Sequence, residues 1–213
     1  MSLTVDPSTH LVWLASRSLG IVALLLISAS VGLGLALSTR LGRLPGSAAR
    51  LKVVHEALAL VALAAIAGHG LLLLADPYLH PTVAEITVPF LIGRDPFWTG
   101  LGIMAGWLAL MFTASFYLRS KIGARLWRRL HRWTILVFAF GLAHTLGTGS
   151  DAGSAWLLAM LGAVTVPIVA IGALRLGRVG VAAMRTAQRP VQQRPVQRDR
   201  PRQALGGGAA GGG

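Results

Sequence analysis

The chain has 213 residues, of which 54% are hydrophobic and 13% are charged, and it contains no cysteine. Soluble domains carry about 25% charged residues, so this composition predicts an integral membrane protein. The absence of thiols excludes disulfides, iron–sulfur clusters, thiolate-ligated haem and haem that is attached covalently through cysteine.

Five stretches of the chain are predicted to cross a bilayer as helices, since each offers close to the roughly 20 residues that a span requires. In chain order they are residues 11–37, 51–75, 98–118, 124–147 and 155–174. The fourth is strongly apolar only from Trp133 onward, and we extend it back through an amphipathic stretch whose arginines can snorkel to the headgroups. The predicted fold is an all-α integral membrane protein, a bundle of about five transmembrane helices.

Three regions are expected along the chain. Residues 1–10 form an outer N-terminal segment, residues 11–176 form the transmembrane bundle, and residues 177–213 form a basic cytoplasmic tail. The tail is rich in Pro, Arg, Gln and Gly, a composition that predicts disorder for most of its length. We expect the chain to have no flavin or NAD(P)H domain of its own.

The distribution of charge predicts the orientation. Eighteen of the 20 basic residues lie near the same ends of the predicted spans, and five of the seven acids lie near the opposite ends. By the positive-inside rule the N-terminus is outside and the C-terminus is cytoplasmic, in a multi-pass protein of the cell membrane. Anionic lipid at the inner leaflet accounts for the net charge of +13, so no nucleic-acid partner is expected.

Four histidines occupy two of the apolar segments at nearly equal spacing. His55 and His69 are 14 residues apart, and His131 and His144 are 13 residues apart. The second and fourth spans run in the same direction, so His55 matches His131 near the cytoplasmic surface and His69 matches His144 near the outer surface. Ionisable residues at membrane depth are costly and usually functional. Two imidazoles from facing helices can ligate one haem iron, which predicts two stacked haems.

The helical phase of the two pairs differs. On an ideal helix, 14 residues bring His69 to within about 40° of His55, whereas 13 residues leave His144 about 140° away from His131. Either the fourth span is locally tightened, for example near Gly141, or its two histidines approach their haems from different sides.

Several other residues have simpler expected roles. Arg17 is the only charge inside the first span and is a candidate partner for a propionate of the outer haem. Gly102 and Gly106 form a G-x-x-x-G pattern that favours helix packing. We expect ordinary surface or loop positions for a further set, His10, His80, Asp76, Asp95 and Asp151.

The histidine-bearing segments resemble a known family. The runs are His55-Glu-Ala-Leu through Ala-Gly-His69-Gly, and Leu126-Trp-Arg-Arg-Leu-His131-Arg-Trp leading to Leu142-Ala-His144-Thr-Leu-Gly. They are similar to the ferric reductase-like transmembrane domain family, which includes NADPH oxidases and the haem-binding membrane subunit of bacterial methionine sulfoxide reductase. The resemblance covers roughly residues 10–175. It implies two b-type haems, the inner one held by His55 and His131 and the outer one by His69 and His144.

The function predicted in this way is a membrane di-haem b cytochrome that relays electrons across the cytoplasmic membrane. The expected donor is a cytoplasmic flavoprotein reductase or a membrane quinol, and the acceptor is an external molecule or a periplasmic reductase. No catalytic residues are predicted, and whether this oxidoreductase component is itself an enzyme stays open. One alternative is the haem-binding subunit of a two-component, sulfoxide-type reductase fed by quinol. Another is a haem-free membrane scaffold or transporter component whose histidines only pack helices.

Overall fold

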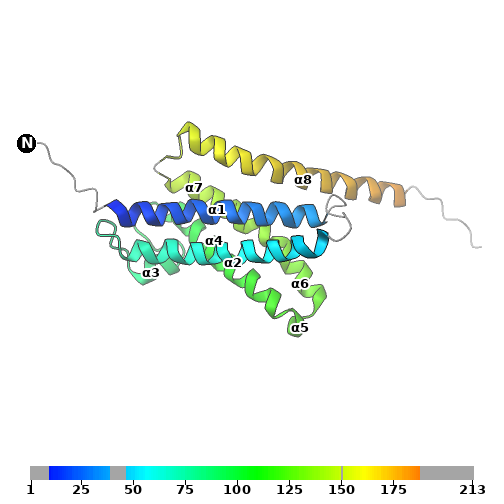
Figure 1. Ribbon diagram of the computed structural model, residues 1–213, viewed down its shortest axis with the longest axis horizontal. Coiled ribbons are helices and arrows are strands. Elements are labelled where there is room, and N and C mark those ends of the chain that lie inside the picture. The colour runs from blue at the N-terminus through cyan, green and yellow to red at the C-terminus, as the bar shows by residue number, and fades with distance from the viewer. Residues whose placement is uncertain (1–9, 39–46, 150, 188–213) are drawn as a thin grey trace, which may run out of the picture. The chain divides into compact units, whose positions relative to one another are not determined.

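The computed structural model describes residues 10–38, 47–149 and 151–187, and every regular element within these ranges is a helix (Figure 1). The predicted all-α fold is confirmed. In chain order the elements are α1 (Leu11–Ser38), α2 (Ser47–Leu74), α3 (Val83–Thr87), α4 (Pro96–Tyr117), α5 (Arg119–Ile122), α6 (Ala124–His131), the 3-10 turn η3 (Arg132–Thr134), α7 (Ile135–Thr148) and α8 (Ala155–Ala187).

Four helices in these ranges are long and apolar enough to cross a membrane. They are Leu11–Ser38, Ala48–Leu74, Pro96–Tyr117 and Ala155–Gly177, and they correspond to four of the five predicted spans. The segment predicted as the remaining span, 124–147, is also helical, but η3 divides it into α6 with 8 residues and α7 with 14. Because α6, η3 and α7 follow one another directly, they form one interrupted helical segment.

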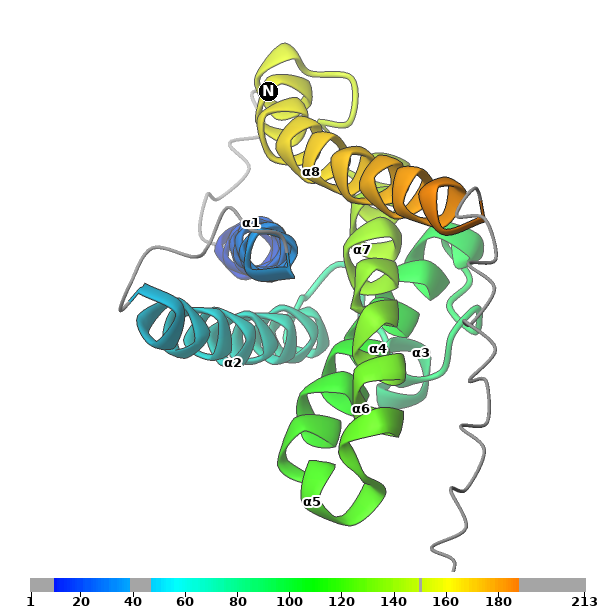
Figure 2. The same cartoon turned by 90° about the vertical axis from the view of Figure 1, so that its right-hand side faces the viewer.

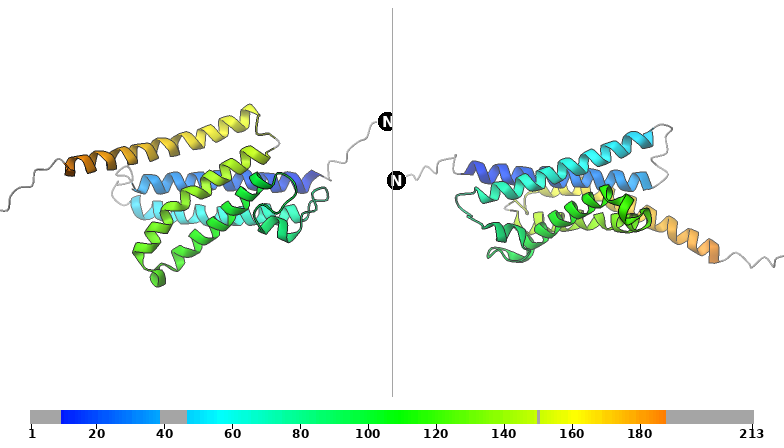
Figure 3. Two further views of the ribbon diagram at one scale, coloured as in Figure 1. Left: turned by 180° about the vertical axis from the view of Figure 1, so that it is seen from behind. Right: turned by 90° about the horizontal axis from the view of Figure 1, so that it is seen from below.

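The transmembrane helices pack chiefly in two pairs. α1 lies along α2, and α4 lies along α7, with further contacts from α1 to α7 and from α2 to α4 (Figures 1 and 2). The same pairing is visible from behind and from below (Figure 3). The main apolar core joins α1, α7 and the first half of α8, and its buried residues are Leu24, Phe138, Leu157, Leu161 and Ile168.

The exposed and buried faces of these helices suit a lipid environment. Large apolar side chains point outward, among them Val53 at 67%, Leu71 at 64% and Val166 at 66% exposure. Small polar residues are buried instead, including Ser16 and Ser30 on α1. Between membrane helices, small residues allow close approach and hydroxyl groups form interhelical hydrogen bonds. The helix interfaces therefore contain the polar groups that would be costly in contact with lipid.

The connection between α2 and α4 is ordered by local hydrogen bonds. Asp76, which we expected to be a solvated loop residue, is only 2% exposed. Its carboxylate accepts hydrogen bonds from the backbone N–H groups of Tyr78 and Leu79 at 2.8 and 3.0 Å, so burial is compensated. The helix α3 that follows begins with a reciprocal capping box between Thr82 and Glu85.

The C-terminal helix extends further than predicted. α8 continues to Ala187, past the predicted end of the bundle at residue 176, and no proline occurs after Pro167 until residue 190. The boundary between two compact units of the chain falls after Arg175, within α8, and the histidines discussed below all precede it. Residues 188–213 of the predicted disordered tail and residues 1–9 of the predicted outer segment lie outside the described residues.

Candidate functional site

The four membrane histidines meet in the two predicted couples. The ring centres of His55 and His131 are 5.9 Å apart with their planes at 86°, and those of His69 and His144 are 6.3 Å apart at 70°. His55 and His69 both come from α2, whereas His131 ends α6 and His144 lies in α7. His55 is the first histidine of α2, and it meets His131, the first histidine of the α6–α7 segment. The two segments therefore run in the same direction.

The 3-10 turn η3 changes the helical phase between His131 and His144. It begins directly after His131. A 3-10 residue turns the chain by about 120° instead of about 100°, so three such residues add about 60°. The local tightening that the spacing left as one alternative is observed, although it lies at η3 and not near Gly141. It removes roughly 60° of the 140° difference expected for a regular helix.

Three of the histidines direct Nδ1 toward a backbone carbonyl of a neighbouring helix. Nδ1 of His69 lies 2.8 Å from the carbonyl oxygen of Ser16, and Nδ1 of His55 lies 2.9 Å from that of Ser30. Nδ1 of His144 lies 3.0 Å from the carbonyl oxygen of Trp98. A carbonyl can only accept, so each Nδ1 carries the proton and donates it. The other ring nitrogen, Nε2, is then left with a free lone pair, which is the form that ligates metals.

His131 is held differently from the other three histidines. Its Nδ1 is buried without a hydrogen-bond partner among the described residues, and the same holds for Nε1 of Trp127. The two rings stack on one another, with centres 5.2 Å apart and planes at 26°. Trp127 lies one helical turn before His131, so the stack fixes the imidazole from within its own helix.

No contact with His55 or His69 was predicted from the sequence for Ser16 or Ser30. Ser16 and Ser30 are 1% and 6% exposed and lie 14 residues apart, the same separation as His55 and His69. This matched spacing on two successive spans is a signal that a search for hydrogen-bonding partners of the histidines could have used.

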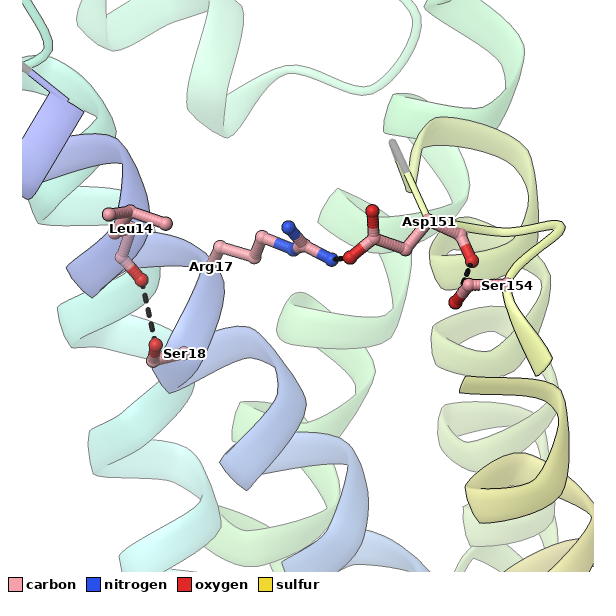
Figure 4. A network of polar contacts seen from close by, with 5 residues as sticks. All are labelled: Leu14, Arg17, Ser18, Asp151 and Ser154. Carbon is pink, nitrogen blue, oxygen red and sulfur yellow. Dashed lines mark hydrogen bonds and ion pairs between the residues drawn. The ribbon is translucent and has the colours of Figure 1, made fainter. Parts of the chain in front are cut away.

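Arg17 has a partner that the sequence did not predict. Its guanidinium forms an ion pair with the carboxylate of Asp151, in the segment before α8 (Figure 4). The guanidinium also lies over the Trp13 ring. We expected Asp151 to be a solvated loop residue, but its side chain is only 34% exposed. A cation inside a span is costly without a counter-ion, which explains why the loop acid turns toward it. His10 and His80 are exposed, as expected.

The donor sets fit iron in a porphyrin better than a metal bound by protein alone. Within the described ranges, no three or more His, Cys, Asp or Glu side chains gather to hold a metal ion, so each level offers two imidazoles. The remaining ligands of a six-coordinate iron must then come from a group such as a porphyrin. An imidazole nitrogen lies about 2 Å from a bound metal and about 1 Å from its ring centre, so two opposed rings have centres about 6 Å apart. The observed values of 5.9 and 6.3 Å agree with this geometry.

Comparison with protein-family models gives a match. The family model described as "Ferric reductase like transmembrane component" matches residues 19–142, which is more than half of the chain and includes three of the four paired histidines. Neither curated proteins nor solved structures gave a match.

Proposed function

We propose that this chain, which belongs to the family of ferric reductase-like transmembrane components, binds two b-type haems and passes electrons between the two faces of the cell membrane. Membership of the family supports a membrane component of the oxidoreductase type. The finer proposal is carried by one observation, the two histidine couples, whose ring separations of 5.9 and 6.3 Å would allow each couple to hold one haem iron.

The residues of the chain would divide the work as follows. His55 and His131 would ligate the inner haem, and His69 and His144 the outer one. Carbonyl groups of α1 and α4 would keep Nε2 of three of these histidines unprotonated and available. Haem, when bound, supplies the one-electron redox chemistry. Arg17, already paired with Asp151, is the proposed cation for a propionate at the outer level.

The orientation and the partners extend this proposal. We place the N-terminus outside and the C-terminus in the cytoplasm, since the basic residues gather at one end of the spans. The basic face would contact anionic lipid. Electrons would enter from a cytoplasmic flavoprotein reductase or a membrane quinol, and would leave to an external acceptor or a periplasmic reductase. If quinol is the donor and a periplasmic reductase is the acceptor, the chain would serve as the membrane subunit of a two-component reductase.

A haem stoichiometry measurement tests the proposal. Protein purified from haem-replete cells is expected to show a b-type reduced-minus-oxidised spectrum with two haems per chain. His69→Ala and His144→Ala should each remove one haem, and His55→Ala and His131→Ala should each remove the other. The exposed His80 is the matched control, because His80→Ala changes the same residue type outside the paired sites and should retain both haems. Colourless protein would support the haem-free scaffold instead.

A further inference from the structure

Helix α1 contains a serine–glycine pattern that repeats at the spacing of the histidines of α2. Ser16 is followed four residues later by Gly20, and Ser30 is followed four residues later by Gly34. The two pairs are 14 residues apart, as are His55 and His69. Residues four apart on a helix lie on the same face, so each serine and its glycine form one contact surface.

The outer pair encloses His69 on two sides. The Ser16 carbonyl oxygen lies 2.8 Å from Nδ1 of His69, and the Ser16 hydroxyl lies 3.0 Å from the same nitrogen. That hydroxyl donates to the His69 backbone carbonyl at 2.9 Å, so its lone pairs are free to accept from Nδ1–H. A Cβ added at Gly20 would come within 3.2 Å of Nδ1, tighter than most real contacts.

The inner pair repeats the arrangement at His55. The Ser30 carbonyl oxygen and hydroxyl lie 2.9 and 3.0 Å from Nδ1 of His55. The hydroxyl also donates to the His55 backbone carbonyl, at the longer distance of 3.4 Å. A Cβ at Gly34 would lie 3.3 Å from Cε1 of the imidazole. The same arrangement therefore occurs twice. In each case a serine carbonyl, a serine hydroxyl and a glycine surround one imidazole.

A third serine–glycine pair on the same helix lacks these contacts. Ser28 and Gly32 are also four residues apart, but the Ser28 hydroxyl donates within its own helix, to the carbonyl of Leu24 at 2.6 Å. A Cβ at Gly32 would meet only Ile168, at 3.9 Å. The pattern of small residues is thus not sufficient by itself, and the contact with an imidazole distinguishes the two pairs that face α2.

We propose that the pairs Ser16/Gly20 and Ser30/Gly34 are positioning residues, each of which fixes the ring orientation and the Nδ1–H tautomer of the histidine on α2 that would ligate a haem at its level. The inference rests on the proposed function and adds to it the residues that prepare two of the four ligands. Groups that hydrogen-bond to a ligating histidine raise its basicity and orient its ring. A more basic ligand favours ferric over ferrous iron, so the loss of such a contact should raise the midpoint potential of the haem concerned.

The prediction is selective by level. Ser16→Ala should raise the midpoint potential of the outer haem and leave that of the inner haem unchanged, and Ser30→Ala should do the reverse. Gly20→Ala should alter the low-spin ferric EPR signal of the outer haem, or cause its loss, and leave the inner haem unchanged. Gly34→Ala should have the same effect on the inner haem and leave the outer haem unchanged. Each haem is assigned beforehand by its loss in His69→Ala or His131→Ala. Ser28→Ala and Gly32→Ala are the matched controls and should leave both haems as in the unmodified protein.

Each result is decisive. If Gly20→Ala does not fold, Ser16→Ala still tests the outer level, since it only removes an atom. The inference is overturned if a serine variant shifts neither potential or shifts both equally, or if Ser28→Ala has the same effect as Ser16→Ala. Absence of haem from the unmodified protein would instead refute the proposed function, so the two failures are distinguishable.

Discussion

Replacement of Gly102 by alanine tests how closely α4 fits the outer histidine. A Cβ at this position would lie 2.7 Å from Cγ and Nδ1 of His144, whereas ordinary contact begins at 3.4 Å. The ring would have to move by about 0.7 Å, and overpacking of this kind costs about 1–3 kcal/mol. The same movement would stretch the 3.0 Å contact between Nδ1 and the Trp98 carbonyl beyond hydrogen-bonding distance.

The expected outcome of Gly102→Ala is a loss of affinity at the outer haem alone. A cost of about 1–3 kcal/mol corresponds to a roughly 5- to 140-fold weaker site, since about 1.4 kcal/mol is tenfold. Haemin titration of the apoprotein, followed in the Soret band, measures both sites. Gly106→Ala is the control, because a Cβ there would meet only the Cγ2 methyl of Ile66, at 3.4 Å. The reasoning fails if Gly102→Ala binds two haems as tightly as the unmodified protein, or if Gly106→Ala weakens the outer site equally.

Three further predictions concern the scaffold. A double-mutant cycle of Arg17→Met and Asp151→Asn, read from unfolding in detergent, should give a coupling of about 0.5–1 kcal/mol, because the pair is partly exposed. Hydrogen bonds from the backbone N–H and the hydroxyl of Thr82 lower the pKa of Glu85. The capping of α3 should therefore be complete above the unfolded pKa and be lost as pH falls through the lower folded pKa, seen as faster amide exchange. Leu157→Ala, at 2% exposure, should destabilise the fold by about 2–5 kcal/mol.

Each of these predictions has its own control. Asp95→Asn changes an exposed acid that has no ion pair among the described residues, and it should leave the unfolding of the Arg17→Met variant unaltered. Thr82→Ala removes the hydroxyl but keeps the backbone N–H, which is the larger cause, so it should return the pKa of Glu85 only part of the way toward its ordinary range and weaken the pH dependence of amide exchange. Leu158→Ala, at 49% exposure, should cost far less than Leu157→Ala. Equal losses at these two neighbouring positions would contradict the assigned packing of α8.

The membrane fold and the pairing of the histidines could be predicted because both follow from properties of single helices. Apolar length predicts each span, and the relative direction of two spans follows from the number of reversals between them. The depth of a histidine then depends only on its position within its span. His55 and His131 are far apart in sequence but lie at the same predicted depth, so they could be paired without knowledge of any side-chain contact.

The contacts of Arg17, Asp76 and Asp151 could not be predicted in the same way. Each depends on the conformation of a loop, which decides whether a loop carboxylate meets its partner. A loop acid with similar neighbours in the sequence can equally face water. Asp76 is buried because a turn brings two backbone N–H groups to its carboxylate. Asp151 turns inward because it forms an ion pair with Arg17, a residue that is adjacent in space although it lies 134 residues away in sequence. Sequence spacing contains no information about either event.

The two levels of histidines also differ in a way that only the packing reveals. At the outer level α1 and α4 each supply a carbonyl, so both His69 and His144 donate from Nδ1. At the inner level only His55 does so, since Nδ1 of His131 has no hydrogen-bond partner among the described residues. The orientation of His131 consequently depends on its stack with Trp127 rather than on a neighbouring helix. A ring held by one stacked neighbour is less constrained than one held by hydrogen bonds, and for this reason His131 should tolerate a change of ring orientation that His144 does not.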